Sequence, residues 1–138
     1  MTAALVAESA RRSRVCWLSY AYDEAGDRVR VEGRLVWHLW HEDALVVLSC
    51  PGPAEQVLPG IDRTGRVEVT MRSKDTKGRL LTWTGMVEVV EVGTASWSGH
   101  VEALLGVRLN LPDVDAARED WAEHGIIVRI RPLPAPVG

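Results

Sequence analysis

Apolar and polar residues alternate along most of the chain between residues 15 and 92, which is the pattern of half-buried β-strands. The longest alternating segment is 28–40, and Gly33 inside it is typical of a bulge or a bend. One face of this segment is predicted to carry Val29, Val31, Leu35, Trp37 and Leu39. Further strands are predicted at 15–22, 44–50, 66–73, 79–92 and 126–132. The chain is therefore predicted to be mostly β.

Two segments follow the helical period instead. Residues 3–13 are rich in good helix formers. Residues 113–124 carry acidic side chains in their first turns and are followed by Gly125, which is the usual order of helix signals. Residues 94–111 fit neither period, and the tail 132–138 is predicted to be flexible.

About six strands in one short chain would leave exposed edges if the sheet stayed open. Closing the sheet into a small barrel removes such edges. With 138 residues, the chain has the length of one domain. The pattern therefore predicts a single domain, residues 1–138, built as an antiparallel β-barrel with peripheral α-helices.

Composition narrows the classes of function. The 16 basic and 19 acidic side chains give a net charge of -3, so the positive excess that dominates nucleic-acid binding is missing. No apolar run reaches the roughly 18 residues of a transmembrane helix, and the N-terminus lacks the order of a secretory signal. We therefore expect a cytoplasmic protein that binds neither nucleic acid nor membrane. Its only Lys residues are Lys74 and Lys77, so a bound anion would contact Arg side chains or backbone amides.

The spacing of the cysteines and histidines gives little support to a disulfide, a reactive thiol or a metal site. Cys16 and Cys50 lie in separate strand-like segments, which favours two buried thiols in a reducing compartment over a disulfide or a reactive thiol. His38 and His41 have the spacing of a metal-ligand pair, but on an extended strand this spacing points the two rings to opposite sides. No metal site is therefore expected.

The segment 34–56 combines the features of a small anion site. A strand that begins at Arg34 is followed by a tight hairpin and by a second strand that ends at Ser49. A Pro/Gly loop then opens a short helix. A hydroxyl, loop amides and a helix N-terminus are thus expected to converge, with Arg34 on the neighbouring strand.

The same residues carry a family resemblance. The pattern R-x-V-W-x-x-W, an acidic turn, A-L-V-V-L-S, a P-G loop, and then R-V-E-V-T-M and R-L-L-T-W-T-G-M-V-E-V-V resembles the pyridoxamine 5'-phosphate oxidase-like split-barrel proteins. It covers roughly residues 14–92 and the final strand I-I-V-R-I-R-P. The family includes FMN-dependent oxidases and reductases and relatives that use the deazaflavin coenzyme. The resemblance implies a split β-barrel and a homodimer that binds its ligand between protomers. Trp40 and Trp83 are candidates for the dimer face; alternatively, each fills its own barrel.

Position by position, the resemblance implies a set of cofactor-binding residues. Arg34 matches the strand Arg that contacts the flavin phosphate, while Val36 and Trp37 match positions whose backbone lies along the isoalloxazine ring. Ser49 matches the hydroxyl residue at the end of the following strand. The loop and the short helix add Cys50, Pro51, Gly52 and Gln56. No catalytic residue is assigned, because the cofactor performs the chemistry in such enzymes.

Two positions depart from the family pattern. The basic triplet that binds the phosphate in the family is replaced here by Pro-Ala-Glu-Gln at 53–56. The family's Gln after the 74–78 loop is replaced by Leu80. Candidates for the missing cation are Arg63, Arg66 and Arg72. One hypothesis is therefore an oxidoreductase that binds FMN or the deazaflavin coenzyme and transfers hydride to or from an unidentified small molecule. The alternative is a cofactor-less split barrel that serves as a small-ligand-binding protein or a dimeric scaffold.

Overall fold

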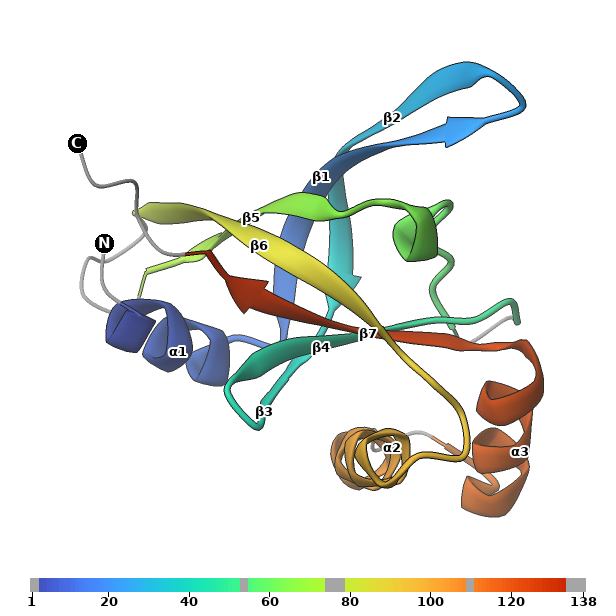
Figure 1. The fold of residues 1–138 in the computed structure, drawn as a ribbon. Helices are drawn as coiled ribbons and strands as arrows, with labels where there is room; N and C mark the ends of the chain where they lie inside the picture. Colours follow the sequence, from blue (N-terminus) through green and yellow to red (C-terminus); the bar gives the residue numbers. More distant parts are fainter. Residues whose placement is uncertain (1–2, 53–54, 74–78, 109–110, 134–138) are drawn as a thin grey trace.

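The structure is a computed structural model that describes residues 3–52, 55–73, 79–108 and 111–133 (Figure 1). The loop 74–78 and residues 134–138 of the predicted flexible tail lie outside the described residues. In chain order the elements are α1 (Ala3–Arg12), β1 (Val15–Glu24), β2 (Asp27–Trp37), β3 (Leu39–His41), β4 (Ala44–Ser49), the 3-10 turn η1 (Ile61–Arg63), β5 (Arg66–Arg72), β6 (Leu80–Val90), α2 (Ala95–Val107), α3 (Val114–His124) and β7 (Ile126–Pro132).

The strands form one antiparallel sheet in the order β2-β1-β5-β6-β7-β4-β3. β2 and β3 are the edge strands of this sheet, yet only His38 separates them along the chain. The sheet therefore curls until its two edges meet at His38, while the tip of the β1–β2 hairpin projects from the body (Figure 1). This confirms the mostly β, antiparallel split barrel with peripheral helices. Because the predicted strand 28–40 is divided at His38, the sheet has seven strands rather than about six.

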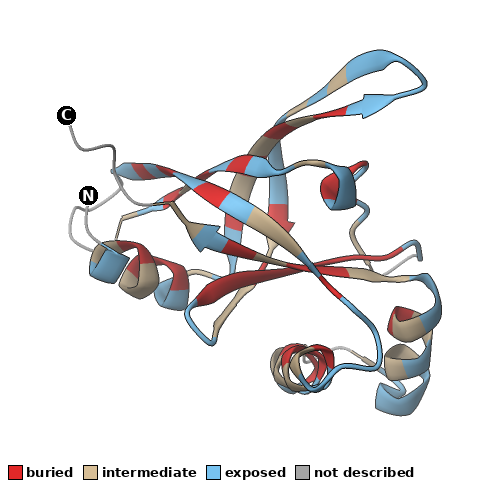
Figure 2. Cartoon of the chain, viewed as in Figure 1, coloured by how far each residue is buried: buried red, intermediate tan, exposed pale blue. Residues whose placement is uncertain are grey.

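β4 separates two hydrophobic cores and is buried along its whole length (Figure 2). Leu45 and Val47 belong to the core inside the barrel. Val46 and Leu48 belong to a second core on the opposite face, to which α2 and α3 contribute. A strand that is buried on both faces carries apolar residues at nearly every position, which explains the apolar run 44–48.

The helices α1 and α3 confirm the two predicted helices, each to within one residue. α3 begins after Asp113, whose side chain accepts a hydrogen bond from the Ala116 N–H. The segment that fitted neither period contains α2, which begins after Thr94, whose side chain accepts a hydrogen bond from the Trp97 N–H. The buried face of α2 is regular, but the rest of the helix carries only one charged residue, Glu102, so the contrast between its faces is weak in the sequence.

The face that β2 buries changes at Gly33. The register between β1 and β2 shifts there, and Ser19 Oγ accepts a 2.8 Å hydrogen bond from the Gly33 N–H. One extra residue in β2 reverses the alternation beyond it. The prediction that Leu35 shares a buried face with Val29 is therefore wrong, because Leu35 is 56% exposed and Val36 is buried instead.

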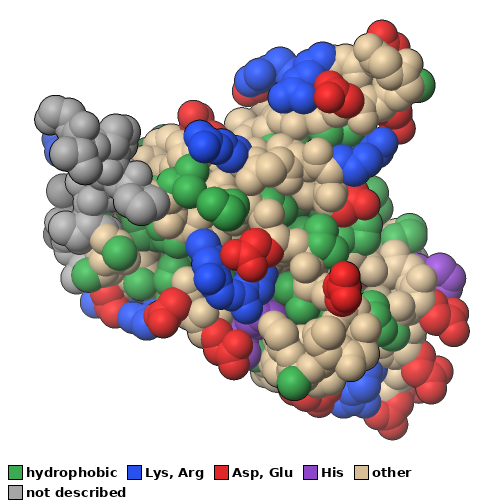
Figure 3. Space-filling model, viewed as in Figure 1, with side chains coloured by type: hydrophobic (Ala, Val, Ile, Leu, Met, Phe, Trp, Pro, Cys, Tyr) green, Lys and Arg blue, Asp and Glu red, His purple; other side chains and the backbone are tan. Residues whose placement is uncertain are grey.

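Charged side chains are spread over the surface. On the face drawn in Figure 3, basic and acidic groups are interspersed. This distribution agrees with the small net charge of -3. Within the described ranges, no helix has the length and apolar character needed to cross a membrane.

Candidate functional site

The predicted cofactor-binding residues come from the ends of β2 and β4 and from the segment after β4, and Gln56 links these parts. Gln56 Oε1 accepts a 2.9 Å hydrogen bond from the Trp37 N–H. Gln56 Nε2 donates 3.0 Å hydrogen bonds to the carbonyl oxygens of Trp37 and Leu48. Because β2 and β4 are not neighbours in the sheet, this side chain joins two strands that do not pair. We name the following residues the Gln56 corner: Trp37, Ser49, Glu55, Gln56 and Arg108.

The segment 55–58 is held against the end of β4. Ser49 Oγ accepts a 2.8 Å hydrogen bond from the Leu58 N–H. The Cys50 N–H donates a 2.8 Å hydrogen bond to the Gln56 carbonyl oxygen. Ser49 is buried as well. The hydroxyl that the family resemblance places at a ligand is thus bonded to the chain itself.

Arg108 neutralises Glu55 inside the corner. Arg108 Nη1 lies 2.9 Å from Glu55 Oε2, and its guanidinium carbon lies 4.3 Å from the centroid of the Trp37 ring. The Arg108 and Glu55 side chains are only 17% and 7% exposed. Sequence reasoning missed Arg108 because it follows α2, which had not been predicted. Arg63, a candidate for the missing cation, lies over the Tyr22 ring instead.

Arg34 is the exposed cation of the predicted set. Its Nη2 donates a 2.8 Å hydrogen bond to the Val57 carbonyl oxygen, which uses one of the five N–H groups of a guanidinium. The other predicted residues differ in exposure. Pro51 and Gly52 are exposed and Trp37 and Gln56 are half-buried, whereas the buried members are Val36, Ser49 and Cys50.

Both cysteines are free and buried, as the sequence favoured over a disulfide or a reactive thiol. Cys50 Sγ donates a 3.6 Å hydrogen bond to Asp120 Oδ2, and Asp120 Oδ1 lies 2.9 Å from His124 Nδ1. Burial, together with the Asp120 carboxylate, raises the pKa of the Cys50 thiol to about 12. Burial raises the pKa of the Cys16 thiol to about 12. Thiols that stay protonated at neutral pH are poor nucleophiles.

The two histidines of the H-x-x-H pair contact different helices. His38 is buried, and its Nε2 donates a 3.1 Å hydrogen bond to the Ala10 carbonyl oxygen of α1. His41 Nδ1 instead lies 2.8 Å from Nδ1 of His100 in α2. The two rings therefore point apart, as their spacing on an extended strand predicted.

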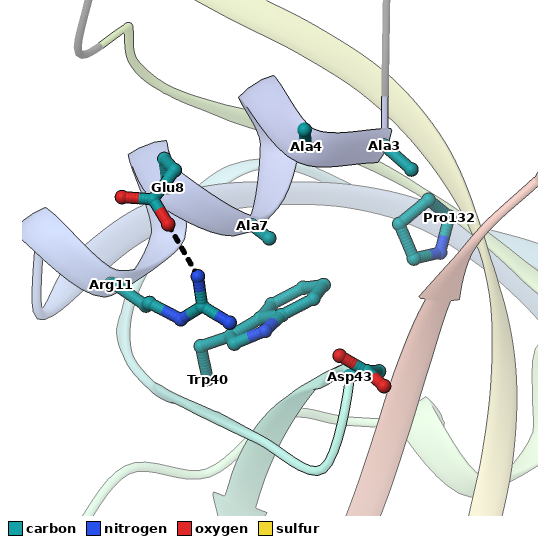
Figure 4. A pocket seen from close by; sticks show the side chains of 8 residues that line it. All are labelled: Ala3, Ala4, Ala7, Glu8, Arg11, Trp40, Asp43 and Pro132. Carbon is teal, nitrogen blue, oxygen red and sulfur yellow. Dashed lines mark hydrogen bonds and ion pairs between the residues drawn. The ribbon is translucent and has the colours of Figure 1, made fainter.

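A cavity of about 390 Å³ lies beside α1 and includes no residue of the Gln56 corner (Figure 4). Trp40 forms one wall, and the Glu8–Arg11 ion pair lies on another. Trp40 Nε1 is buried and makes no hydrogen bond within the described residues. Of the two predicted candidates for a dimer face, Trp83 lies inside its own barrel core and Trp40 packs against that core.

Comparison with known proteins supports the fold. No family model matches the sequence, and no curated protein does. The structure resembles the heme storage protein HutZ from Vibrio cholerae, with a TM-score of 0.63, 15% identity and coverage of 98% of this chain and 93% of HutZ. It resembles an FAD-binding protein from Mesorhizobium loti, with a TM-score of 0.55, 18% identity and coverage of 97% and 90%.

A third similar structure is a protein from Listeria innocua provisionally named a pyridoxamine 5'-phosphate oxidase. Its TM-score is 0.59, at 14% identity, over 96% of this chain and 94% of that protein. Identities this low establish the fold alone. The fold of the chain is therefore that of the pyridoxamine 5'-phosphate oxidase-like split-barrel proteins, as the sequence resemblance implied.

Proposed function

We propose that the protein is a flavin- or deazaflavin-binding oxidoreductase of the split-barrel type that acts on a small molecule. The observation that carries this proposal is the exposed Arg34 guanidinium against the segment 55–58. Glu55, the carboxylate of that segment, is neutralised by Arg108. A cofactor phosphate at this corner would thus meet a cation without an opposing free carboxylate.

The residues present fit the phosphate end of such a cofactor. Arg34 offers guanidinium N–H groups beyond the one that bonds Val57, and Pro51 and Gly52 are exposed beside the same segment. Gln56 is a positioning residue, because its amide bonds the backbone of both strands. When bound, the flavin or deazaflavin ring would supply hydride transfer, and the chain's residues would bind and orient it.

Titration of the purified chain with FMN and with the deazaflavin coenzyme, followed by fluorescence quenching, tests this proposal. We expect saturable quenching by one of them and about tenfold weaker binding by Arg34→Ala, because a charge-assisted contact is lost. Arg30→Ala is the matched control, since Arg30 lies on the same strand and pairs with Glu32. The absence of quenching by either coenzyme, or equal affinity of Arg34→Ala and wild type, would overturn the proposal.

We also propose a cytoplasmic homodimer, in which a second copy covers the outer face of β1 and β2. Cross-strand pairs on that face join Val15 to Trp37 and Trp17 to Leu35. Val15 and Leu35 are 43% and 56% exposed, which is unusual for a contiguous apolar strip on a monomer. We expect a dimer mass in light scattering at micromolar concentration and a monomer for Leu35→Glu; a monomeric wild type would contradict this. The two free buried thiols agree with a reducing compartment.

A cofactor-less binding protein or scaffold is the second candidate. It is favoured by Gln56 and Ser49, whose polar atoms already bond the chain where a coenzyme would need donors. The same two experiments separate the candidates. A dimer whose fluorescence titration shows no quenching with either coenzyme would favour the scaffold. Saturable quenching that depends on Arg34 would exclude the scaffold.

A further inference from the structure

His41 and His100 bring two imidazole rings together between β3 and α2. His41 is the last residue of β3, and His100 lies in the middle of α2. Their Nδ1 atoms are 2.8 Å apart, and the rings meet edge to face with centroids 4.9 Å apart. His100 is fully buried, whereas His41 is half-buried. One ring of the pair is therefore embedded in protein and the other reaches toward solvent.

A shared proton does not satisfy this pair. One proton between the two Nδ1 atoms pairs them only with each other, and an ion bound to both would replace that single contact. Nitrogen lone pairs on neutral imidazoles are what a metal ion binds.

Glu42 supplies a carboxylate beside the two rings. His41, Glu42 and His100 offer ligand atoms that all lie within 4.8 Å of one another. Zinc–nitrogen bonds of about 2.0–2.1 Å in a tetrahedral site place two nitrogens roughly 3.3 Å apart. The Nδ1 atoms are slightly closer than this, so a small ring rotation would admit an ion. Glu42 is exposed, which gives the ion a path from solvent.

We propose that His41, Glu42 and His100, the histidine site, bind a divalent transition-metal ion of the zinc class. Both Nδ1 atoms and the Glu42 carboxylate are the ligands, and a fourth position stays open to water. Two imidazoles with one carboxylate suit zinc or cobalt better than magnesium or calcium, which prefer oxygen ligands. The histidine site shares no residue with the Gln56 corner, so this proposal stands apart from coenzyme binding.

Calorimetric titration of the full chain with Zn²⁺, and the visible spectrum with Co²⁺, test the proposal. We expect one ion per chain, a higher melting temperature with Zn²⁺, and affinity at least about tenfold lower in His41→Ala and Glu42→Gln. Both substitutions lie outside the cores, so circular dichroism of the metal-free variants should match wild type. His100→Gln should lose binding too, but it counts only if that variant remains folded.

His124→Ala is the matched control. His124 is also a histidine beside a carboxylate, Asp120, whose other oxygen contacts Cys50, but it lies on α3. This variant should bind Zn²⁺ as wild type does. Zero stoichiometry in wild type, unchanged affinity in His41→Ala, or loss of binding in His124→Ala would each overturn the assignment of the ion to the histidine site.

Discussion

The Gln56 corner and the histidine site pair their buried polar groups differently. In the corner, the Gln56 amide makes three hydrogen bonds to backbone, and Glu55 is paired with Arg108. In the histidine site, the buried His100 ring has one nitrogen against His41 and the other without a partner in the described residues. A buried polar atom costs free energy unless it is paired.

This difference separates groups that stabilise the fold from groups that remain available to a ligand. Polar atoms that bond the chain hold two unpaired strands together, but they offer less to an external molecule. The two Nδ1 atoms of the histidine site face each other instead of the backbone, so they remain available to an ion. Within the Gln56 corner and its surroundings, the exposed Arg34 is therefore the residue most able to contact a ligand directly.

The largest expected effect is the loss of Arg108. Arg108→Met leaves the Glu55 carboxylate buried and unpaired, so we expect a loss of about 3 kcal/mol in the free energy of unfolding. Urea unfolding measures it. Arg118→Met is the control, because Arg118 pairs with exposed carboxylates and its loss should lower stability far less. Equal losses in the two variants would show that the corner pair is no more important than a surface pair.

Gln56→Ala is expected to cost about 2–3 kcal/mol, because it leaves the Trp37 N–H and two carbonyl oxygens unpaired near the core. Thr82→Ala removes one exposed hydrogen bond to Thr70 and should cost less than about 0.5 kcal/mol. The measurement is again urea unfolding. A Gln56→Ala variant as stable as Thr82→Ala would mean that water forms hydrogen bonds with these backbone groups and that the Gln56 corner is accessible to solvent.

Acidification probes His38, whose Nε2 bonds the Ala10 carbonyl oxygen and whose Nδ1 has no partner among the described residues. Burial lowers the pKa of His38 below 6.5 in the folded protein. Below pH 6.5 the unfolded chain therefore binds a proton that the folded chain does not, and stability falls as the pH falls. We expect urea unfolding to show a loss of at most about 1 kcal/mol between pH 6.5 and pH 5.5, and a shallower dependence on pH for His38→Gln. An unchanged slope in that variant would assign the effect to other groups.

The smallest effect concerns the turn that carries Glu42. Glu42 and Asp43 both have left-handed backbone angles, with φ of 52° and 60°, in the two-residue hairpin between β3 and β4. The β1–β2 hairpin has Gly26 at the position that corresponds to Asp43. Asp43→Gly should stabilise the protein by up to about 1 kcal/mol, and Gly26→Ala should destabilise it by a similar amount.

Thermal and urea unfolding measure both turn variants. Asp43→Gly should also leave Zn²⁺ affinity near that of wild type, because Asp43 is not among the three proposed ligands. A large loss of Zn²⁺ binding in this variant would show that the strained turn, rather than Glu42 itself, sets the ligand geometry.

Much of the fold could be predicted because local patterns report which face of an element is buried. The short, largely apolar run 44–50 predicted a strand, and β4 has a hydrophobic core on each side. α2 was not predicted because its outer face carries only one charged residue and therefore contrasts little with its buried face. Leu35 was assigned to the wrong face because a bulge reverses every residue beyond Gly33.

By itself, the sequence determined most of the strands, two of the helices and the barrel class, and it predicted a coenzyme site in the segment 34–56. Only the tertiary structure decided which polar groups pair. Arg108 reaches Glu55 and His100 reaches His41 across 53 and 59 positions of the chain. No local period encodes such contacts, because they depend on how α2 packs against the strands. Secondary structure follows from neighbouring residues, whereas a binding site follows from residues that folding brings together.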